Sequence, residues 1–312
     1  MSKKIHLYHH DDCLLHEPGA YHPENPGRLR AVTSKLHDSM LGLNLEWIEA
    51  EAGNNEQVLL AHDTAMLHEV LATAPDEGHA SLDGDTIMSP HSLEAAMKAV
   101  GAACGGVDAL MTDRIANVFC LTRPPGHHAT PDHAMGFCIF NHMAVAALYA
   151  QQRFGLERIA IVDFDVHHGN GTQDIMRGRS GQLYISSHQS PHYPGTGSVK
   201  ENLGHNIFNL PLPAGTGHDE YTSLFNARIM PELEEFKPQL LLVSAGFDAH
   251  RLDPLGGLEF TEATYFWLGQ TLASVAKKHG GGKLLSVLEG GYNLDVLGQS
   301  VAAYLEGTLS VV

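Results

Sequence analysis

The segment 163–167, Asp-Phe-Asp-Val-His, places two carboxylates and an imidazole at alternating positions directly after an apolar run. Alternate side chains of an extended strand point to the same face, so Asp163, Asp165 and His167 can converge on one ligand. Carboxylate oxygen and imidazole nitrogen are typical ligands of Zn²⁺ and similar divalent ions. We therefore expect a metal site at this position.

A further carboxylate, Asp248, follows a second apolar run in the sequence Gly246-Phe-Asp248. Together with Asp165 and His167 it would provide two carboxylates and one imidazole. Such a set leaves a coordination position open, and an open position is typical of a catalytic metal site.

Two adjacent histidines, His127 and His128, follow the stiff turn Pro-Pro-Gly. They could be two metal ligands or an acid/base pair, and we favour the pair because Asp163 and Asn170 remain to orient their other ring nitrogens. A carboxylate partner raises the pKa of an imidazole, whereas an amide leaves it nearer neutrality. Tyr292, after a Gly-Gly turn, could stabilise an oxyanion or could simply pack.

Apolar segments that alternate with helical patterns must position these groups, and this alternation predicts a parallel sheet covered by helices on both faces. Each polar cluster directly follows such a run, and therefore lies at the carboxyl edge, where α/β sheets bind ligands. The expected strands are 5–8, 117–121, 158–164, 183–186, 207–210, 240–244 and 284–288. The expected helices are 26–41, 92–111, 142–154, 219–236, 261–279 and 294–309.

Composition narrows the function classes. The 312 residues include 19 Lys and Arg against 36 Asp and Glu, a net charge of −17, which argues against a broad nucleic-acid-binding face. No apolar stretch is long enough to span a membrane, and the first residues lack the apolar core of a signal peptide. We expect one cytoplasmic domain over residues 1–312, with four dispersed cysteines that form no disulfide framework.

Histidine is unusually frequent, with 22 residues, but most lie outside these motifs. Without a neighbouring ligand set, a histidine is more often a surface or helix-capping residue than a metal ligand. We expect that role for His9, His10, His22, His62, His68, His79 and His218.

The motifs together resemble those of the histone deacetylase family, in particular its class II-like branch of bacterial deacetylases and acetylpolyamine amidohydrolases. The resemblance covers nearly the whole chain. It implies an arginase/deacetylase-like three-layer α/β fold and zinc-dependent hydrolysis of N-acetyl amides. The matching segments are His22–Arg28, Arg123–His128, Gly136-Phe137, Asp163–Gly171, Gly246–Asp248 and Gly290–Tyr292.

The resemblance implies roles for individual residues. Asp165, His167 and Asp248 would bind one zinc ion, and Tyr292 would polarise the acetyl carbonyl. His127 and His128 would be the acid/base pair, oriented by Asp163 and by Asn170, which stands where class I members have aspartate. A potassium ion would be bound at Asp163, Asp165, His167, Ser186 and Ser187, partly through backbone carbonyl oxygens. The substrate would contact Gly136, Phe137 and Tyr193 along a tube and Asp85 at its rim, and Arg28 would lie near an internal channel for acetate.

The implied activity is removal of acetyl or related acyl groups from acetyl-lysine in proteins or peptides. Acetylpolyamines and small acetylated metabolites present the same acetamide and are the alternative substrates. A binuclear manganese ureohydrolase would typically need Asp-x-His-x-Asp, and an inactive acetyl-binding module would lack a ligand, the histidine pair or Tyr292. The sequence leaves open the acyl-chain preference, zinc against iron in the cell, and the oligomeric state.

Overall fold

Eight strands form the central sheet of the protein. They are β1 (Ile5–His9), β2 (Leu45–Glu49), β5 (Asn117–Cys120), β6 (Ile159–Asp163), β7 (Gln182–Gln189), β8 (Ile207–Leu212), β9 (Leu240–Ala245) and β10 (Leu284–Leu288). The computed structural model describes residues 4–113 and 115–311. Residues 1–3 lie outside these ranges, and so does that part of the N-terminal segment for which the sequence predicts no signal peptide.

The strands are arranged in the order β2-β1-β5-β10-β9-β6-β7-β8, and every neighbouring pair is parallel. The four strands that precede the polar motifs, β5, β10, β9 and β6, are adjacent at the centre of this sheet. Their ends are level, because Ser244 pairs with Val287 on one side and with Asp163 on the other. The chain therefore brings all four motifs to one stretch of the carboxyl edge.

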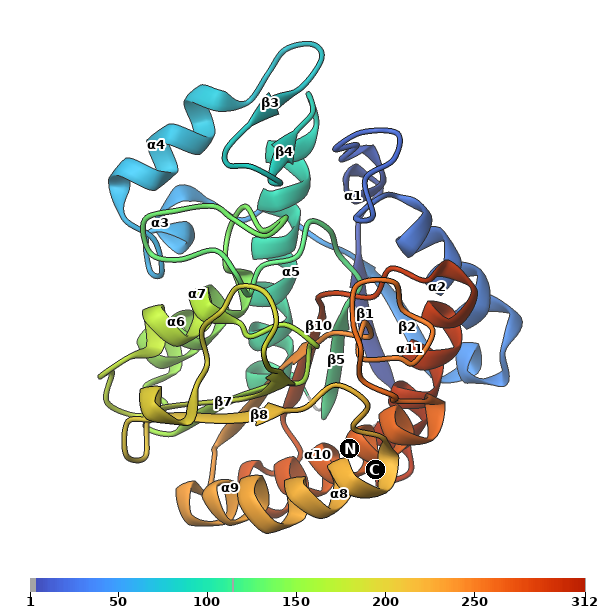
Figure 1. Ribbon diagram of the computed structural model, residues 1–312. Coiled ribbons are helices and arrows are strands. Elements are labelled where there is room, and N and C mark those ends of the chain that lie inside the picture. Colours follow the sequence, from blue (N-terminus) through green and yellow to red (C-terminus); the bar gives the residue numbers. More distant parts are fainter. Residues whose placement is uncertain (1–3, 114, 312) are drawn as a thin grey trace.

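Helices cover both faces of the sheet (Figure 1). Alternate residues of the central strands pack with α2, α8, α10 and α11 in one apolar core and with α5 and α6 in the other. The longer helices are α2 (Gly27–Asp38), α4 (Thr64–Thr73), α5 (Ser92–Thr112), α6 (His142–Phe154), α10 (Glu262–Gly280) and α11 (Leu294–Leu309). The shorter helices are α1 (Asp12–Leu15), α3 (Asn55–Val58), α7 (Asn170–Met176), α8 (His218–Leu224) and α9 (Met230–Phe236), with η1 (Met40–Asn44), η2 (Val199–Glu201) and η3 (Phe225–Ile229). The predicted α/β class, a parallel sheet between helical layers, is confirmed.

Two differences from the sequence expectations concern the sheet edge and the segment 219–236. The edge strand β2 was not predicted, because Glu46 and Glu49 face solvent and interrupt the apolar pattern. The single helix expected over 219–236 consists of α8, a π-helical turn (η3) and α9.

A small hairpin, β3 (Ala80–Ser81) and β4 (Ile87–Met88), extends beyond the sheet together with α4 (Figure 1). Its turn carries Asp83 and Asp85. His22, in the loop before α2, contacts the hairpin, since its Nε2 lies 3.2 Å from the carbonyl oxygen of Asp85. This hairpin therefore places the predicted rim carboxylate.

Candidate active site

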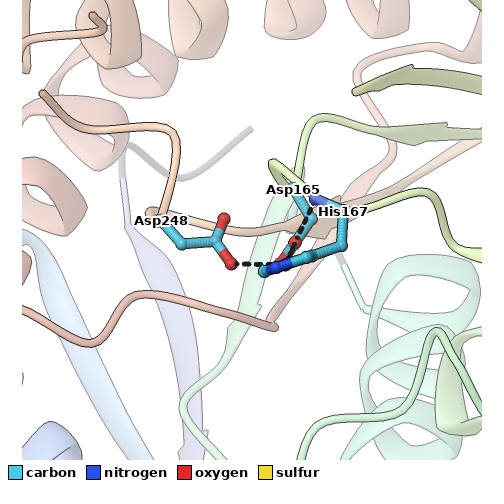
Figure 2. A group of neighbouring side chains, drawn as sticks. All are labelled: Asp165, His167 and Asp248. Carbon is cyan, nitrogen blue, oxygen red and sulfur yellow. Dashed lines mark hydrogen bonds and ion pairs between the residues drawn. The ribbon is translucent and has the colours of Figure 1, made fainter. Parts of the chain in front are cut away.

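The predicted metal ligands converge from two neighbouring strands. Asp165 and His167 follow β6 and Asp248 follows β9, and all three side chains are buried. His167 Nδ1 lies 3.1 Å from Asp165 Oδ1 and 3.2 Å from Asp248 Oδ2 (Figure 2). One candidate ligand atom from each residue lies within 4.8 Å of the others. The triad is the one such group of three or more potential ligands among the residues that the structure describes.

The surroundings of the triad leave one carboxylate oxygen unsatisfied. Asp248 Oδ1 accepts the backbone N–H of Val166, whereas the buried Oδ2 has no hydrogen bond of good geometry. Burial, together with the charge of Asp165, raises the pKa of Asp248 to about 7. Glycine is required at 246 and 290, because a Cβ at either position would press into the carboxylates of the triad. A small cation with oxygen and nitrogen ligands would satisfy this arrangement.

The two adjacent histidines have different partners. His127 Nδ1 lies 3.0 Å from Asp163 Oδ2, and His128 Nδ1 lies 2.8 Å from Asn170 Oδ1. Burial opposes a charged His127, but Asp165 and Asp163 outweigh it and raise the pKa of His127 to about 10. For His128, burial and then the charge of His127 hold the pKa well below its usual value. These surroundings therefore favour a charged His127 and a neutral His128.

A cavity of about 220 Å³ opens next to these groups. It exposes His128 and His167 to a substrate, with the ring of Tyr292 in its wall. Burial holds the pKa of Tyr292 well above 10, so that its hydroxyl keeps a proton to donate. The cavity is lined by Asp85, His128, Gly136, Phe137, His167, His192, Tyr193, Leu255 and Tyr292.

The chain is similar to known proteins over most of its length. The histone deacetylase domain matches residues 22–308 of the chain. The chain belongs to the histone deacetylase family. Members of this family are deacetylases and amidohydrolases, and they are zinc-dependent in general.

The similarity to individual histone deacetylase relatives extends over the whole fold. Histone deacetylase 14 of Arabidopsis thaliana is 39% identical, over 94% of this chain and 71% of its own length. A histone deacetylase-like amidohydrolase of Pseudomonas aeruginosa is 35% identical, over 100% of this chain and 88% of its own length. The crystal structure of the HDA15 HD domain superposes with a TM-score of 0.92 at 35% identity, covering 99% of this chain and 89% of that one. The predicted arginase/deacetylase-like fold is thereby confirmed.

The four residues expected along the substrate tube and its rim line the cavity, whereas Arg28, expected near an internal channel, does not. Its guanidinium is fully buried and donates to the carbonyl oxygens of Gly291 and Glu289 and to the carboxylate of Glu24. It also lies 4.9 Å from the centre of the Tyr292 ring. Arg28 thus supports the wall of the cavity from behind.

Ser186 and Ser187, which the family resemblance implies as part of a potassium site, lie on β7, and their hydroxyls already form hydrogen bonds. Ser186 follows the register of β7 directly beside Asp163. The Ser186 hydroxyl lies 2.8 Å from His188 Nδ1, and the Ser187 hydroxyl lies 2.9 Å from the hydroxyl of Tyr221. A cation there would have to use carbonyl oxygens or displace these bonds, and the site stays a prediction.

Sequence reasoning missed two residues of the cavity, His192 and Leu255. The ring of His192 stacks on His167 at 4.8 Å, and its Nε2 donates to the carbonyl oxygen of Leu255 at 2.8 Å. Both residues lie in irregular loops, where no periodicity marks which side chains turn inward. The nearest sequence signal is the position of His192 directly before Tyr193.

The expectation for the remaining histidines is wrong for His62, which is 4% exposed. Its Nδ1 donates to the carbonyl oxygen of Thr130, and its Nε2 accepts the backbone N–H of Asn141, both at 2.8 Å. His62 thereby ties the turn between α3 and α4 to the loop that carries Gly136 and Phe137. All four cysteines are free and buried. No helix within the described ranges is long and apolar enough to cross a membrane.

Proposed function

We propose that this chain hydrolyses the acetamide of acetyl-lysine in peptides or proteins, using one zinc ion held by Asp165, His167 and Asp248. The observation that carries the proposal is a single cavity that brings a member of the triad, the neutral histidine of the pair and Tyr292 to one ligand-sized space. The rings of Phe137 and Tyr193 in its lining suit the apolar, uncharged arm of an acetylated lysine.

The triad fits a zinc ion, because its donors are two carboxylates and an imidazole and one buried oxygen of Asp248 lacks a hydrogen bond. Zinc bound there supplies Lewis acidity, which polarises the acetamide carbonyl and makes water more acidic. Asp165 is held in place by the backbone N–H of Gly290, which donates to its Oδ2 at 2.8 Å.

His128 is the better placed general base. The Asn170 oxygen is an acceptor, so His128 Nδ1 carries the hydrogen and Nε2 keeps a free lone pair. A neutral imidazole that lines the cavity can take the proton from attacking water and later deliver it to the departing amine. His127, paired with Asp163, keeps its positive charge and stabilises the negative charge that develops nearby.

Tyr292 completes the arrangement as a hydrogen-bond donor to the oxyanion. Its ring packs edge-on against Phe137 at 5.9 Å, and its backbone N–H donates to Asp253 Oδ2 at 2.6 Å. These contacts fix the phenol before substrate arrives, which makes the donor effective without reorganisation.

An acetylpolyamine is the second candidate substrate, because the cavity mouth is acidic. Asp85 lines the cavity and lies two residues from Asp83, and burial and the charge of Asp83 raise the pKa of Asp85. A carboxylate there could accept backbone N–H groups of a peptide or attract the ammonium groups of a polyamine.

Kinetics on the zinc-loaded chain would test both the activity and the substrate class. We expect Asp85→Asn to lower kcat/KM for an acetyl-lysine peptide about 10- to 150-fold, the value of a charge-assisted hydrogen bond of roughly 1.5–3 kcal/mol. A minimal acetamide that does not reach the rim should be unaffected, as should Asp132→Asn, a control at an exposed carboxylate. Much faster turnover of acetylpolyamines, with Asp85→Asn leaving peptide turnover unchanged, would refute the preference for acetyl-lysine. Absence of turnover with all three substrates would refute the proposed activity.

A further inference from the structure

A buried carboxylate that the proposed reaction does not use holds the backbone of the histidine pair. Glu289 follows β10 and is fully buried. Its Oε2 accepts the backbone N–H of Gly126 at 2.7 Å and that of His127 at 3.2 Å. One oxygen from the central strand β10 therefore fixes the turn that follows the neighbouring strand β5.

His142, the first residue of α6, supports the same turn from a second direction. A Cβ on Gly126 would lie 2.6 Å from His142 Nδ1, so the imidazole occupies the space that any other side chain would need. His142 Nε2 and Glu289 Oε1 lie 3.9 Å apart, and both are buried without a hydrogen bond. The turn is therefore held between a carboxylate and an imidazole that face each other.

The same short segment after β10 also reaches the metal ligands. The backbone N–H of Gly290, the next residue, donates to Asp165 Oδ2 at 2.8 Å. Consecutive residues thus hold the histidine pair through a side chain and one ligand of the triad through the backbone. The separation between these two groups depends on this segment, and catalytic groups must be held to within a fraction of an ångström.

We infer that Glu289 is a positioning residue for the reaction, setting the placement of His127 and His128 relative to the triad, with His142 as its support. The inference rests on the proposed function, because the placement matters for catalysis only if His128 transfers protons and His127 stabilises negative charge there. What the role requires is an acceptor oxygen at the position of Oε2, so glutamine should substitute for glutamate. Its amide can also donate toward His142 Nε2.

The test compares Glu289→Ala, Glu289→Gln and Gln182→Ala in the zinc-loaded protein. Gln182 is a buried amide at the start of β7, away from the motif-bearing edge, and controls for loss of a buried polar group. We expect Glu289→Ala to lower kcat on the order of 10²-fold, the effect of a displacement of about 1 Å, with KM and zinc content unchanged. Glu289→Gln should recover most of kcat, and Gln182→Ala should keep it. Hydrogen exchange at the amides of residues 126 and 127 should accelerate in Glu289→Ala.

Two results would overturn the inference. One is an unchanged kcat in Glu289→Ala, and the other is a parallel loss of kcat and zinc, which would show that Glu289 builds the metal site instead. If the wild-type chain is inactive on acetylated amines, the proposed function fails. In that case, accelerated exchange at residues 126 and 127 would still report that Glu289 holds the turn.

Discussion

Two buried clusters of charged residues lie beside Tyr292, and they are satisfied in opposite ways. One is centred on Glu24, in the loop before α2, and the other is the triad of Asp165, His167 and Asp248. Both combine carboxylates with nitrogen bases away from solvent. The way in which their carboxylates are paired distinguishes a cluster that stabilises the fold from one that can bind a ligand.

The Glu24 cluster is closed. One carboxylate contacts the guanidinium groups of Arg28 and Arg123, and its Oε2 lies 3.2 Å from His16 Nε2. Arg123 also donates to the carbonyl oxygens of Cys13 and His16. These contacts hold the pKa of Glu24 well below its usual value: burial opposes this, but Arg123 and His16 outweigh it.

In the triad, by contrast, two carboxylates share one imidazole, and Asp248 Oδ2 has no hydrogen bond. A desolvated carboxylate oxygen that lacks a hydrogen bond of good geometry is costly, so a fold retains such a group where something else binds it. We therefore interpret the Glu24 cluster as structural and the open triad as a candidate ligand site.

Removing a carboxylate from the open cluster should have the largest effect. We expect Asp248→Asn to reduce zinc from about one ion per chain to a substoichiometric amount and to abolish turnover, a loss of up to about 10⁶-fold if catalysis is entirely metal-dependent. In the metal-free state the free energy of unfolding of this variant should be at least that of the wild type, because the repulsion between Asp248 and Asp165 is removed. Metal analysis, kinetics and urea unfolding measure the three effects. Two tightly bound transition ions per wild-type chain would instead favour the ureohydrolase alternative.

The same kind of substitution in the closed cluster should act on stability. Glu24→Gln leaves Arg28 and Arg123 with no buried counter-charge, and we expect it to lower the free energy of unfolding by about 3–5 kcal/mol. Glu157→Gln removes an exposed contact with Arg158 and should cost less than about 1 kcal/mol. Chemical unfolding at neutral pH compares them. If Glu24→Gln lowered the free energy of unfolding no more than the exposed control Glu157→Gln, the Glu24 cluster would not stabilise the fold. The distinction between the two clusters would then be refuted.

Tyr292 lies between the two clusters, with Arg28 of the closed one packed behind its ring. Tyr292→Phe keeps this packing and removes only the hydroxyl. We expect kcat to fall about 10²–10³-fold, as for other oxyanion donors, with zinc content and stability retained. Tyr149→Phe is the control, because the Tyr149 hydroxyl donates a hydrogen bond to Asp108 of α5. Near-wild-type turnover in Tyr292→Phe would show that the oxyanion is held by other groups.

The sequence could predict the centre of this molecule better than its loops. Strand bounds such as 284–288 and the convergence of Asp165 with Asp248 follow from apolar runs and from the common edge of parallel strands. The Glu24 cluster could not be predicted, because its contacts join residues up to 110 positions apart through irregular segments. The role of Glu289 was hidden for a similar reason: its acceptor oxygen meets backbone N–H groups, which leave no mark in the sequence.

The smallest expected effect concerns His62, a buried base whose two hydrogen bonds make it a closed site like the Glu24 cluster. Because Nε2 accepts the N–H of Asn141, a proton there would break that bond. Burial lowers the pKa of His62 to about 4 from its usual 6.5. Above pH 6.5 the ring is neutral in both states, and its contribution to stability is fully present. As the pH falls from 6.5 toward 4, only the unfolded chain takes up the proton, so stability is lost.

His62→Gln isolates this contribution, since glutamine can accept the N–H of Asn141 without titrating. One pKa unit corresponds to about 1.4 kcal/mol, so the stability advantage of the wild type over the variant should shrink by about 2 kcal/mol between pH 6.5 and 5. Urea unfolding of both proteins at several pH values measures this difference. His68→Gln, at an exposed histidine of α4, should show no such trend. A pH-independent difference between wild type and His62→Gln would mean that the folded protein accepts the proton at His62 and that this site is open.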